Sequence, residues 1–391
     1  MNLAQAVGSK FNELFSGKPL IVRSPGRANL IGEHTDYNMG YVLPCAIDKA
    51  IYFAIAPGAG RHCSFYALDL KQKFECETTE LVKSERGWPN YLMGVVDQLQ
   101  QSGRSVGGFN CVFGGNIPIG AGLSSSAAIE AGLMFALNYL YGLGLDKRSI
   151  VRLAQKSENE FVGVQCGIMD QFINIFGESG SALRIDCRSL DYKYFPFEDQ
   201  NVSLVLFNSK VSHALASSEY NQRRRECGEG VKIIRKSAAA VETLRDVSST
   251  MLGEFTTAMD PTIYRRCKYV VQENDRVLSA CNALESKDLN AFGRYMFQTH
   301  DGLSRDYEVS CPELDYLVEA VRGKPGVYGA RMMGGGFGGC TINLVEPNAV
   351  DSLGSMVTEK YFKKFHRKAE MYITSISSGT RIVPIDENSR D

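Results

Sequence analysis

A segment in the first half of the chain has the composition of a phosphate-binding loop. It reads Pro118-Ile119-Gly120-Ala121-Gly122-Leu123-Ser124-Ser125-Ser126-Ala127-Ala128. Its glycines allow the backbone to approach a ligand because no Cβ stands in the way. Apolar residues follow at helical spacing, so the N–H groups of a helix start would face a polyphosphate and a serine hydroxyl could ligate its magnesium. A serine-rich cap on a core helix also fits this composition, and no Walker Gly-Lys-Ser is present.

A second segment combines charged and hydrogen-bonding side chains at high density. It reads Ser24-Pro25-Gly26-Arg27-Ala28-Asn29-Leu30-Ile31-Gly32-Glu33-His34-Thr35-Asp36-Tyr37-Asn38. Pro25-Gly26 predicts a turn, and Arg27 is a permanent cation suited to a phosphate or a carboxylate. Glu33, His34 and Asp36 offer donors and acceptors suited to a polyol. An exposed polar loop is the alternative, and a metal site is disfavoured because adjacent ligands without a distant second group rarely close one.

Other charged and aromatic residues allow two interpretations each. Asp170 stands among apolar neighbours, where a carboxylate is either a satisfied structural group or a functional one. Glu158 and Glu160, on a predicted helix, are by default a surface pair. Trp88 could stack on a base or simply pack in the core. Arg223-Arg224-Arg225 is most simply a solvated helix face.

Composition limits the possible partners. The chain has 391 residues, of which 44% are hydrophobic, so about two domains are expected. Lys plus Arg number 43 against 44 for Asp plus Glu, which leaves no net field for nucleic acid or a membrane and favours a small-molecule partner. Eleven cysteines without a C-x-x-C pair indicate a reduced cytoplasmic protein without structural zinc. We expect neither a signal peptide at Met1–Lys10 nor a membrane span.

Periodicity places these segments on an α+β pattern. The predicted strands cover 20–23, 42–56, 63–68, 108–113, 182–186, 203–207, 327–331, 340–345 and 369–374. Helices are predicted over 3–15, 88–99, 129–141, 150–161 and 350–362, and over most of 226–322. The polar stretch 191–200 is a candidate lobe boundary, and 333–339 is a glycine-rich loop between strands.

Together these stretches resemble the galactokinases, within the wider family of galactokinase, homoserine, mevalonate and phosphomevalonate (GHMP) kinases. Gly26–Asn38 resembles the galactokinase signature, Pro118–Ala127 the phosphate motif and Gly334–Gly339 the C-terminal glycine motif. Three shorter matches are Cys166–Gln171, Ser217–Tyr220 and Asp306–Asp315. Two positions depart from the family pattern. Met333 stands where threonine is common, and Ala128 replaces a frequent serine.

The resemblance implies a two-lobed GHMP-kinase fold, of mixed sheets with helices packed on them and the active site in the cleft between the lobes. The lobes would be 1–194 and 195–391, with the last strand as a candidate to return to the first lobe. ATP with Mg²⁺ would phosphorylate the anomeric hydroxyl of α-D-galactose, giving galactose 1-phosphate and ADP. The expected protein is cytoplasmic and monomeric.

The resemblance also implies roles for individual residues. Asp170 would be the catalytic carboxylate, with Arg27 beside it, and Trp88 would lie near adenine. The sugar would be lined by Glu33, His34, Thr35, Asp36, Gly167 and Tyr220. The phosphates would be bound by Gly120, Ala121, Gly122, Leu123, Ser124, Ser125 and Ser126, and the magnesium by Ser126 and Glu158.

The residue types agree with phosphoryl transfer, which needs positioning and charge stabilisation. Arg27 can stabilise charge on the transferring phosphoryl group and favour the ionised form of Asp170. Asp170 could then take the sugar's proton or merely orient it. Carboxylates that each bridge sugar hydroxyls would discriminate against an epimer such as glucose.

Three other functions compete with this prediction. A non-catalytic galactose and ATP sensor on the same fold is disfavoured, because such proteins carry a deletion in the phosphate motif and Ser126-Ala127-Ala128 is intact. A kinase for a related sugar such as N-acetylgalactosamine is disfavoured by the unbroken signature. A dinucleotide-dependent oxidoreductase lacks its glycine fingerprint.

Overall fold

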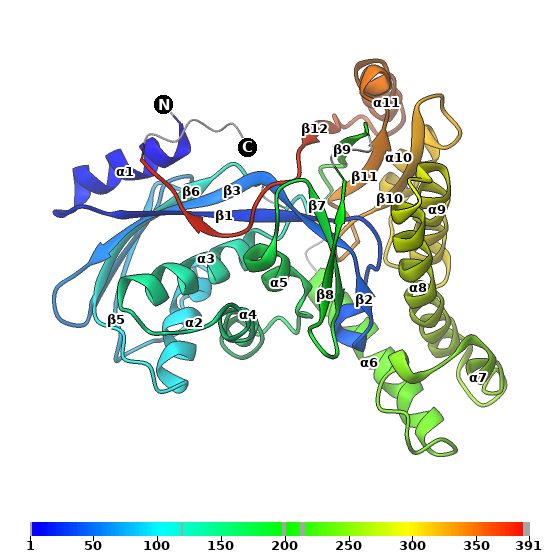
Figure 1. Ribbon diagram of the computed structural model, residues 1–391, viewed down its shortest axis with the longest axis horizontal. Coiled ribbons are helices and arrows are strands. Elements are labelled where there is room, and N and C mark those ends of the chain that lie inside the picture. The colour runs from blue at the N-terminus through cyan, green and yellow to red at the C-terminus, as the bar shows by residue number, and fades with distance from the viewer. Residues whose placement is uncertain (1, 119, 198–200, 212–215, 386–391) are drawn as a thin grey trace.

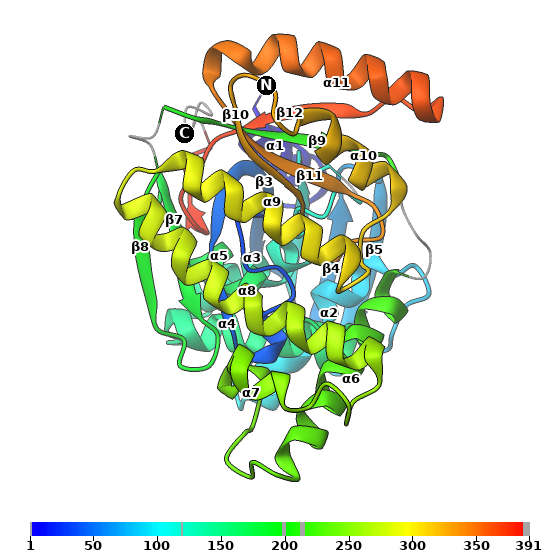
Figure 2. The same ribbon diagram turned by 90° about the vertical axis from the view of Figure 1, so that its right-hand side faces the viewer.

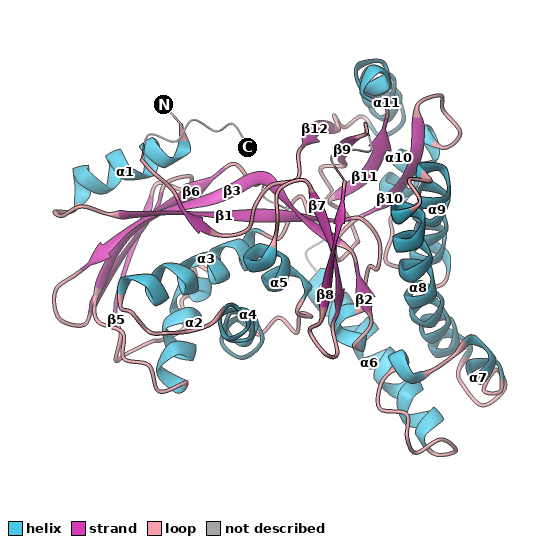
Figure 3. Ribbon diagram, viewed as in Figure 1, coloured by secondary structure: helices cyan, strands magenta, loops and turns pink. Residues whose placement is uncertain are grey.

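The computed structural model describes residues 2–118, 120–197, 201–211 and 216–385 (Figure 1). Helices cover mixed sheets, which confirms the predicted α+β class (Figure 3). Across these described ranges, no helix combines the length and the apolar character that crossing a bilayer requires.

The largest sheet has six strands in the order β13-β1-β3-β6-β4-β5. Their bounds are Leu20–Asn29 (β1), Pro44–Pro57 (β3), His62–Ala67 (β4), Gln72–Glu77 (β5), Phe109–Gly115 (β6) and Arg381–Ile382 (β13). Neighbours pair antiparallel except β4 and β6, which are parallel. Although β13 comes from the end of the chain, it lies beside β1, with Ile382 opposite Val22.

Each face of this sheet has its own apolar core because successive side chains on a strand point to opposite faces. On β3, Tyr52 and Ala54 share a core with α1 (Leu3–Leu14), whereas Phe53 and Ile55 belong to the larger core on the other face. Figure 1 shows α1 on one face of the sheet and α2 (Trp88–Gln101), α3 (Ser125–Leu140), α4 (Lys147–Lys156) and α5 (Met169–Phe176) on the other.

The second half of the chain builds a four-stranded antiparallel sheet in the order β10-β11-β9-β12. Its strands are β9 (Ser203–Asn208), β10 (Val327–Met332), β11 (Cys340–Val345) and β12 (Glu370–Thr374). The long helices α8 (Pro261–Glu285) and α9 (Leu289–Arg305) lie side by side (Figure 2), and α10 (Pro312–Val321) and α11 (Val350–Phe365) complete this part.

The structure also contains a small third sheet and two further helices. The sheet contains β2 (Tyr41–Val42), β7 (Ser181–Asp186) and β8 (Tyr192–Pro196) in the order β2-β7-β8. The helices are α6 (Ala216–Arg235) and α7 (Ser249–Gly253). The sequence analysis missed β8, whose strand lies in the polar stretch 191–200, and also missed the exposed edge strand β5.

The predicted turn at Pro25-Gly26 is wrong. Strand β1 continues through both residues, and a register shift between Pro25 and Arg27 takes up the irregularity. The glycine has a packing reason instead, since a Cβ at Gly26 would lie 2.8 Å from the carbonyl oxygen of Leu123. Strand β1 therefore delivers Arg27 directly beneath the glycine-serine loop.

Candidate active site

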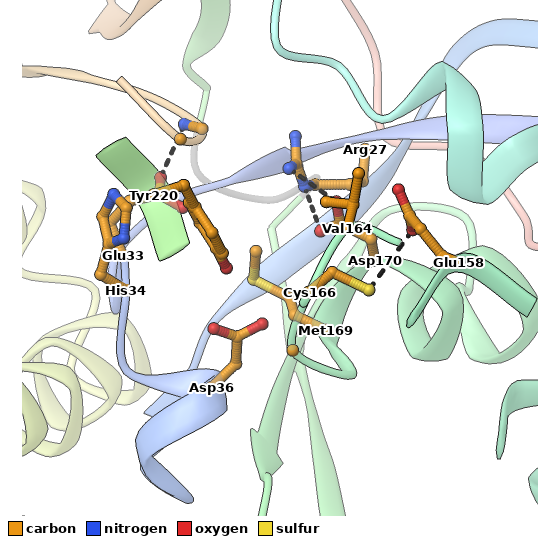
Figure 4. Close-up of a pocket in the computed structure, with 13 residues that line it drawn as sticks. Arg27, Glu33, His34, Asp36, Glu158, Val164, Cys166, Met169, Asp170 and Tyr220 are labelled. Atoms are coloured by element: carbon orange, nitrogen blue, oxygen red, sulfur yellow. Dashed lines mark hydrogen bonds and ion pairs between the residues drawn. The ribbon is translucent and has the colours of Figure 1, made fainter. Parts of the chain in front are cut away.

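A cavity of about 240 Å³ lies where β1, the segment Glu33–Asp36, the C-terminal glycine loop and α6 meet. It is lined by Arg27, Glu33, His34, Asp36, Glu158, Val164, Cys166, Gly167, Met169, Asp170, Tyr220, Gly334 and Gly335. Figure 4 shows His34 and Tyr220 on one side, Arg27, Asp170 and Glu158 on the other, and the carboxylate of Asp36 pointing between them. The cavity thus collects residues that are more than 300 positions apart in the sequence, since it joins Arg27 to Gly335.

Arg27 and Asp170 form a two-bond ion pair at one end of the cavity. The guanidinium donates from Nε to Oδ1 at 2.7 Å and from Nη2 to Oδ2 at 2.9 Å, while Nη1 donates to the carbonyl oxygen of Gly122. Burial opposes the charge of Arg27, but Asp170 and then Glu33 outweigh it and raise the pKa of the guanidinium. Asp170, in the first turn of α5, keeps about a quarter of its side chain exposed, so it remains accessible to a ligand.

The phosphate-loop residues lie above this pair, between β6 and the start of α3, as predicted. Ser124 is the residue before α3, has a left-handed backbone with φ of 58°, and donates its hydroxyl to Asp170. Gly120 and Gly122 have φ of 72° and 73°, the region that favours glycine. Ile119 lies outside the described residues.

The C-terminal glycine loop lies against the phosphate loop. A Cβ on Gly122 would be 3.4 Å from the carbonyl oxygen of Met333, and one on Gly339 would be 3.4 Å from that of Ala121. At Met333, where the family pattern has threonine, the side chain is buried. The two glycine-rich loops therefore converge, and Gly334 and Gly335 of the second loop line the cavity.

Glu33 is held by a cation that the sequence analysis missed. Fully buried Arg331, on β10, donates to Glu33 Oε2 at 2.8 Å, and the Gly334 N–H donates to the same oxygen at 2.9 Å. Burial by itself would raise the pKa of Glu33, but Arg331 and Arg27 outweigh it and lower that pKa. The sequence feature that could have identified Arg331 is a single arginine in an otherwise apolar strand just before the glycine-rich loop.

Burial is the largest influence on the ionisation of both Asp36 and His34. Burial, followed by repulsion from Asp170, raises the pKa of Asp36 to about 7. Burial lowers the pKa of His34 to about 4, so its imidazole is neutral at physiological pH. Gly167 lies directly against Asp36, because a Cβ there would be only 1.9 Å from Asp36 Oδ2. This close approach explains why the position is a glycine.

Several residues predicted for the site do not line the cavity: Thr35, Trp88 and the phosphate-loop residues Gly120–Ser126. The Thr35 hydroxyl lies 2.9 and 2.6 Å from the carbonyl oxygens of Gly32 and Tyr41, and donating its single hydrogen to them stabilises the loop that carries Asp36. At the start of α2, the Trp88 indole donates to Gln72 at 2.9 Å while its ring contacts Phe74 and Phe113.

The surface assignment of Glu158 is wrong, and so is that of Arg223. Glu158 lies in a π-helical turn, Ser157–Val162, and is only 6% exposed. Its carboxylate faces the cavity and accepts a hydrogen bond from the Gln171 side chain at 2.9 Å. Arg223 is 5% exposed because it donates to the carbonyl oxygens of Tyr307 and Glu308. A cluster of charged residues in a helical pattern does not reveal which of the side chains is buried.

Behind Glu158 lies a second buried carboxyl group that the sequence analysis overlooked. Glu130, on α3, is fully buried and accepts from the Ser157 hydroxyl at 3.3 Å. Burial, and then the charge of Glu158, raises its pKa well above the usual range, and burial followed by Asp170 also raises the pKa of Glu158. Ser126 contacts Glu158 as well. Among the described residues, no group of three His, Cys, Asp or Glu side chains could by itself hold a metal ion.

Comparison with known proteins places this arrangement among sugar kinases. Residues 9–57 match the galactokinase galactose-binding signature, residues 90–178 the GHMP kinases N terminal domain, and residues 280–363 the GHMP kinases C terminal domain. A galactokinase of Roseiflexus sp. strain RS-1 is 41% identical over 360 residues, 92% of each chain. One of Chloroflexus aggregans is 40% identical over 378 residues, 96% of this chain and 97% of its own.

The fold agrees with these sequence matches. The crystal structure of Lactococcus lactis galactokinase complexed with galactose superposes with a TM-score of 0.94 at 34% identity, covering 98% of this chain and all of the other. Both the sequence and the three-dimensional arrangement are therefore shared over nearly the full length.

Proposed function

The chain belongs to the galactokinases, within the GHMP kinase family, and we propose that Arg27 and Asp170 act at the reacting atoms of its reaction. The activity is the ATP-dependent phosphorylation of galactose. The observation that carries the proposed site is the two-bond contact between Arg27 and Asp170, set beneath two converging glycine loops at one end of a polar cavity. The finer proposal is transfer to the anomeric hydroxyl of α-D-galactose.

At the reacting end, the protein contributes charge and orientation. As the bond between the sugar oxygen and the γ-phosphorus forms, the bond from that phosphorus to the leaving oxygen of ADP breaks. Asp170 accepts or orients the proton that leaves the sugar hydroxyl, and the Ser124 hydroxyl helps to hold its carboxylate in place. Arg27 stabilises the negative charge on the transferring group.

At the other end, buried polar groups recognise the sugar hydroxyls. Glu33, fixed by Arg331, and Asp36, fixed by the Tyr37 N–H at 2.9 Å, present carboxyl groups on two sides. His34 and Tyr220 complete the wall, and Gly167 leaves room for Asp36. An epimer that moves one hydroxyl leaves one of these buried groups unpaired, which is the physical basis for selectivity.

Mg²⁺ fits the oxygen donors beneath the phosphate loop. Ser126 and Glu158 lie together there, and a hydroxyl plus a carboxylate are the hard ligands that Mg²⁺ accepts alongside phosphate oxygens. When bound, the ion would neutralise phosphate charge. Residues 120–126 would bind the phosphates through backbone N–H groups.

The remaining proposals concern the protein as a whole. We assign residues 1–194 and 195–391 to two lobes, with β13 returning from the second segment to pair with β1 in the sheet of the first. We place the protein in the cytoplasm because its eleven cysteines are free thiols. Roles for Thr35 in sugar binding and for Trp88 near adenine stay predictions.

The test is ADP release with Mg²⁺ and ATP, using galactose, glucose, N-acetylgalactosamine and arabinose, on the native protein and on Asp170→Asn. Galactose-dependent turnover that collapses in the variant supports the proposed roles. Glu160→Gln, on an exposed residue of the π-helical turn, is the matched control. Galactose binding without ADP release would favour a sensor, and a better substrate among the other sugars would overturn the choice of galactose.

A further inference from the structure

A cluster of hydrogen-bonded polar side chains lies outside the cavity, where segments from both ends of the chain meet. It consists of Ser24 on β1, Asn174 on α5 and Thr380, the residue before β13. All three side chains are buried, and none of them lines the cavity. Burying such groups costs free energy unless each of them is paired.

The hydrogen bonds of this cluster have a defined direction. Asn174 Nδ2 lies 2.6 Å from the carbonyl oxygen of Pro25 and 2.9 Å from Ser24 Oγ, and it donates to both. Because a carbonyl oxygen only accepts, the amide nitrogen must face Pro25, which leaves Oδ1 to accept from the Thr380 hydroxyl at 2.6 Å. The Ser24 hydroxyl donates to the carbonyl oxygen of Ala128 at 2.7 Å. Each side-chain hydrogen in the cluster therefore has an acceptor.

The cluster connects the three elements that carry the reacting end. Each element has one residue bonded in the cluster and, three or four positions away, one residue of the reacting end. The pairs are Ser24 with Arg27 on β1, Asn174 with Asp170 on α5, and Ala128 with Ser124 at the start of α3. Since residues four apart on a helix lie on the same face, the cluster and the reacting end share one side of α5. A change in the cluster therefore displaces the groups that meet at the reacting end.

The C-terminal segment completes this cluster. Besides the hydroxyl contact, the Thr380 N–H donates to the carbonyl oxygen of Asn174 at 2.7 Å, and the Gly379 N–H donates to that of Gly177 at 2.9 Å. The next residues form β13, which pairs with β1. None of the described residues of this segment lines the cavity. The segment nevertheless joins the strand and the helix whose side chains form the ion pair.

We propose that Ser24, Asn174 and Thr380 are positioning residues that align Arg27, Asp170 and the start of α3, so that phosphoryl transfer depends on a C-terminal segment outside the cavity. This inference rests on the proposed roles of Arg27 and Asp170 at the reacting atoms.

Hydrogen bonds suit this task because they fix both distance and direction. The helix packs closely here, since a Cβ on Gly132 of α3 would lie 2.6 Å from Ser24 Cβ. Three elements thus meet at short range, with a polar cluster to set their relative positions. A misplacement of about 1 Å, even from a change far from the reacting atoms, can lower a rate about 10²-fold.

The first test is the kinetics of Thr380→Val, which keeps the shape of the side chain but removes its hydroxyl. Because Asn174 Oδ1 then loses its closest donor, we expect kcat for ADP release to fall about tenfold. The KM values for galactose and ATP should stay within about twofold of the native values. Thr380→Ser keeps the hydroxyl and should restore kcat. A native kcat in Thr380→Val, or an equal loss in Thr380→Ser, would overturn the proposal.

Thr374→Val is the matched control for lost stability. Thr374, on β12, is also buried, but its hydroxyl donates to Asp48 on β3 and not to β1, α3 or α5. We expect both valine variants to lower the urea concentration at the midpoint of unfolding, while only Thr380→Val lowers kcat. Equal losses of kcat in the two variants would mean that Thr380 acts through stability alone.

A spectroscopic test reads the alignment without sugar or ATP. The Arg27 Nε–H donates to Asp170 Oδ1, so its ¹H–¹⁵N signal reports the geometry of the pair. The spectrum of Arg27→Lys, which has no Nε–H, assigns that signal. We expect the signal to shift in Thr380→Val and in Ser24→Ala but not in Thr374→Val. An unmoved signal in both cluster variants would contradict the inference.

The two experiments also separate this inference from the proposed function. If Asp170→Asn keeps the native galactose-dependent turnover, the proposed role of that carboxylate fails. The Arg27 signal in Ser24→Ala and Thr380→Val still decides whether the cluster aligns the pair, because it requires no turnover.

Discussion

The two ends of the cavity use opposite electrostatic designs. At the reacting end, Arg27 and Asp170 are a directly bonded ion pair that keeps partial access to solvent. At the sugar end, His34 is neutral and the pKa of Asp36 is raised to about 7, since burial dominates both. A fixed charge pair suits a transition state that gains and redistributes charge, whereas weakly charged groups suit an uncharged sugar.

Glu33 combines features of both ends of the cavity. It is buried at the sugar end, yet Arg331 and Arg27 lower its pKa, whereas the pKa of Asp36 is raised to about 7. The difference between the two carboxyls is therefore set by the cations around them rather than by burial, which both share. Substituting those cations should therefore test the difference in pKa between Glu33 and Asp36.

The largest effect is expected from Arg331→Met. The substitution leaves Glu33 buried beside no partner cation on β10, and breaking a buried ion pair costs about 3–5 kcal/mol. The free energy of unfolding in urea should fall by that amount. In the double variant Arg331→Met with Glu33→Gln, part of the loss should be recovered because the stranded charge is gone. Additive losses would contradict the pairing.

Arg27→Lys should affect catalysis more than stability. Lysine keeps the positive charge but cannot make both bonds to Asp170 and the bond to Gly122 that the guanidinium makes. We expect kcat for ADP release to fall about 10²–10³-fold, as when one preorganised donor is removed from a transition state. Arg188→Lys, on an exposed arginine that also bonds a carboxylate, is the control. A kcat within a few-fold of the native value would remove Arg27 from the reacting end.

Asp36→Asn tests the sugar end through pH. The native carboxyl has its pKa raised to about 7 from an ordinary value of 3.8, so the folded protein binds more protons than the unfolded chain between these values. Stability contributed by the protonated carboxyl is therefore lost as pH rises through this window.

The variant lacks this titration, so its unfolding free energy relative to the native protein should rise by about 2–3 kcal/mol from about pH 5 to pH 8. Urea unfolding at both pH values measures the difference. Asp275→Asn, on an exposed residue of α8, should show a constant difference. A constant difference for Asp36→Asn as well would mean that this carboxyl is charged throughout.

The sequence was sufficient to predict most of the elements and to single out Arg27 and Asp170, which the structure brings into contact. Arg27, Asp170 and the glycine-serine loop are recognisable because their types stand out locally, and strand and helix periods carry the α+β pattern. The sequence could not reveal which polar residues turn inward. Arg223, Glu130 and Arg331 are buried by contacts with segments far along the chain, and no local period records such a contact.

The same limit applies to Pro25-Gly26. Local turn chemistry predicted a break, but pairing with β3 on one side and the close approach of Leu123 kept the strand continuous. The hydrogen bond between the Tyr37 and Tyr307 hydroxyls could not be predicted either, because the two residues are 270 positions apart in the sequence.

The smallest effect is expected from Glu158→Gln, which tests whether this carboxyl ligates Mg²⁺. Glu158 is a buried carboxyl whose pKa is raised by burial and then by Asp170, like that of Asp36, but it lies beside Ser126 under the phosphate loop. If it ligates Mg²⁺, the neutral amide should raise the Mg²⁺ concentration for half-maximal ADP release by at least about tenfold, with little change in the KM for galactose. Glu160→Gln, on the exposed side of the same turn, should need no extra Mg²⁺. An unchanged Mg²⁺ requirement in Glu158→Gln would show that this carboxyl does not ligate the ion.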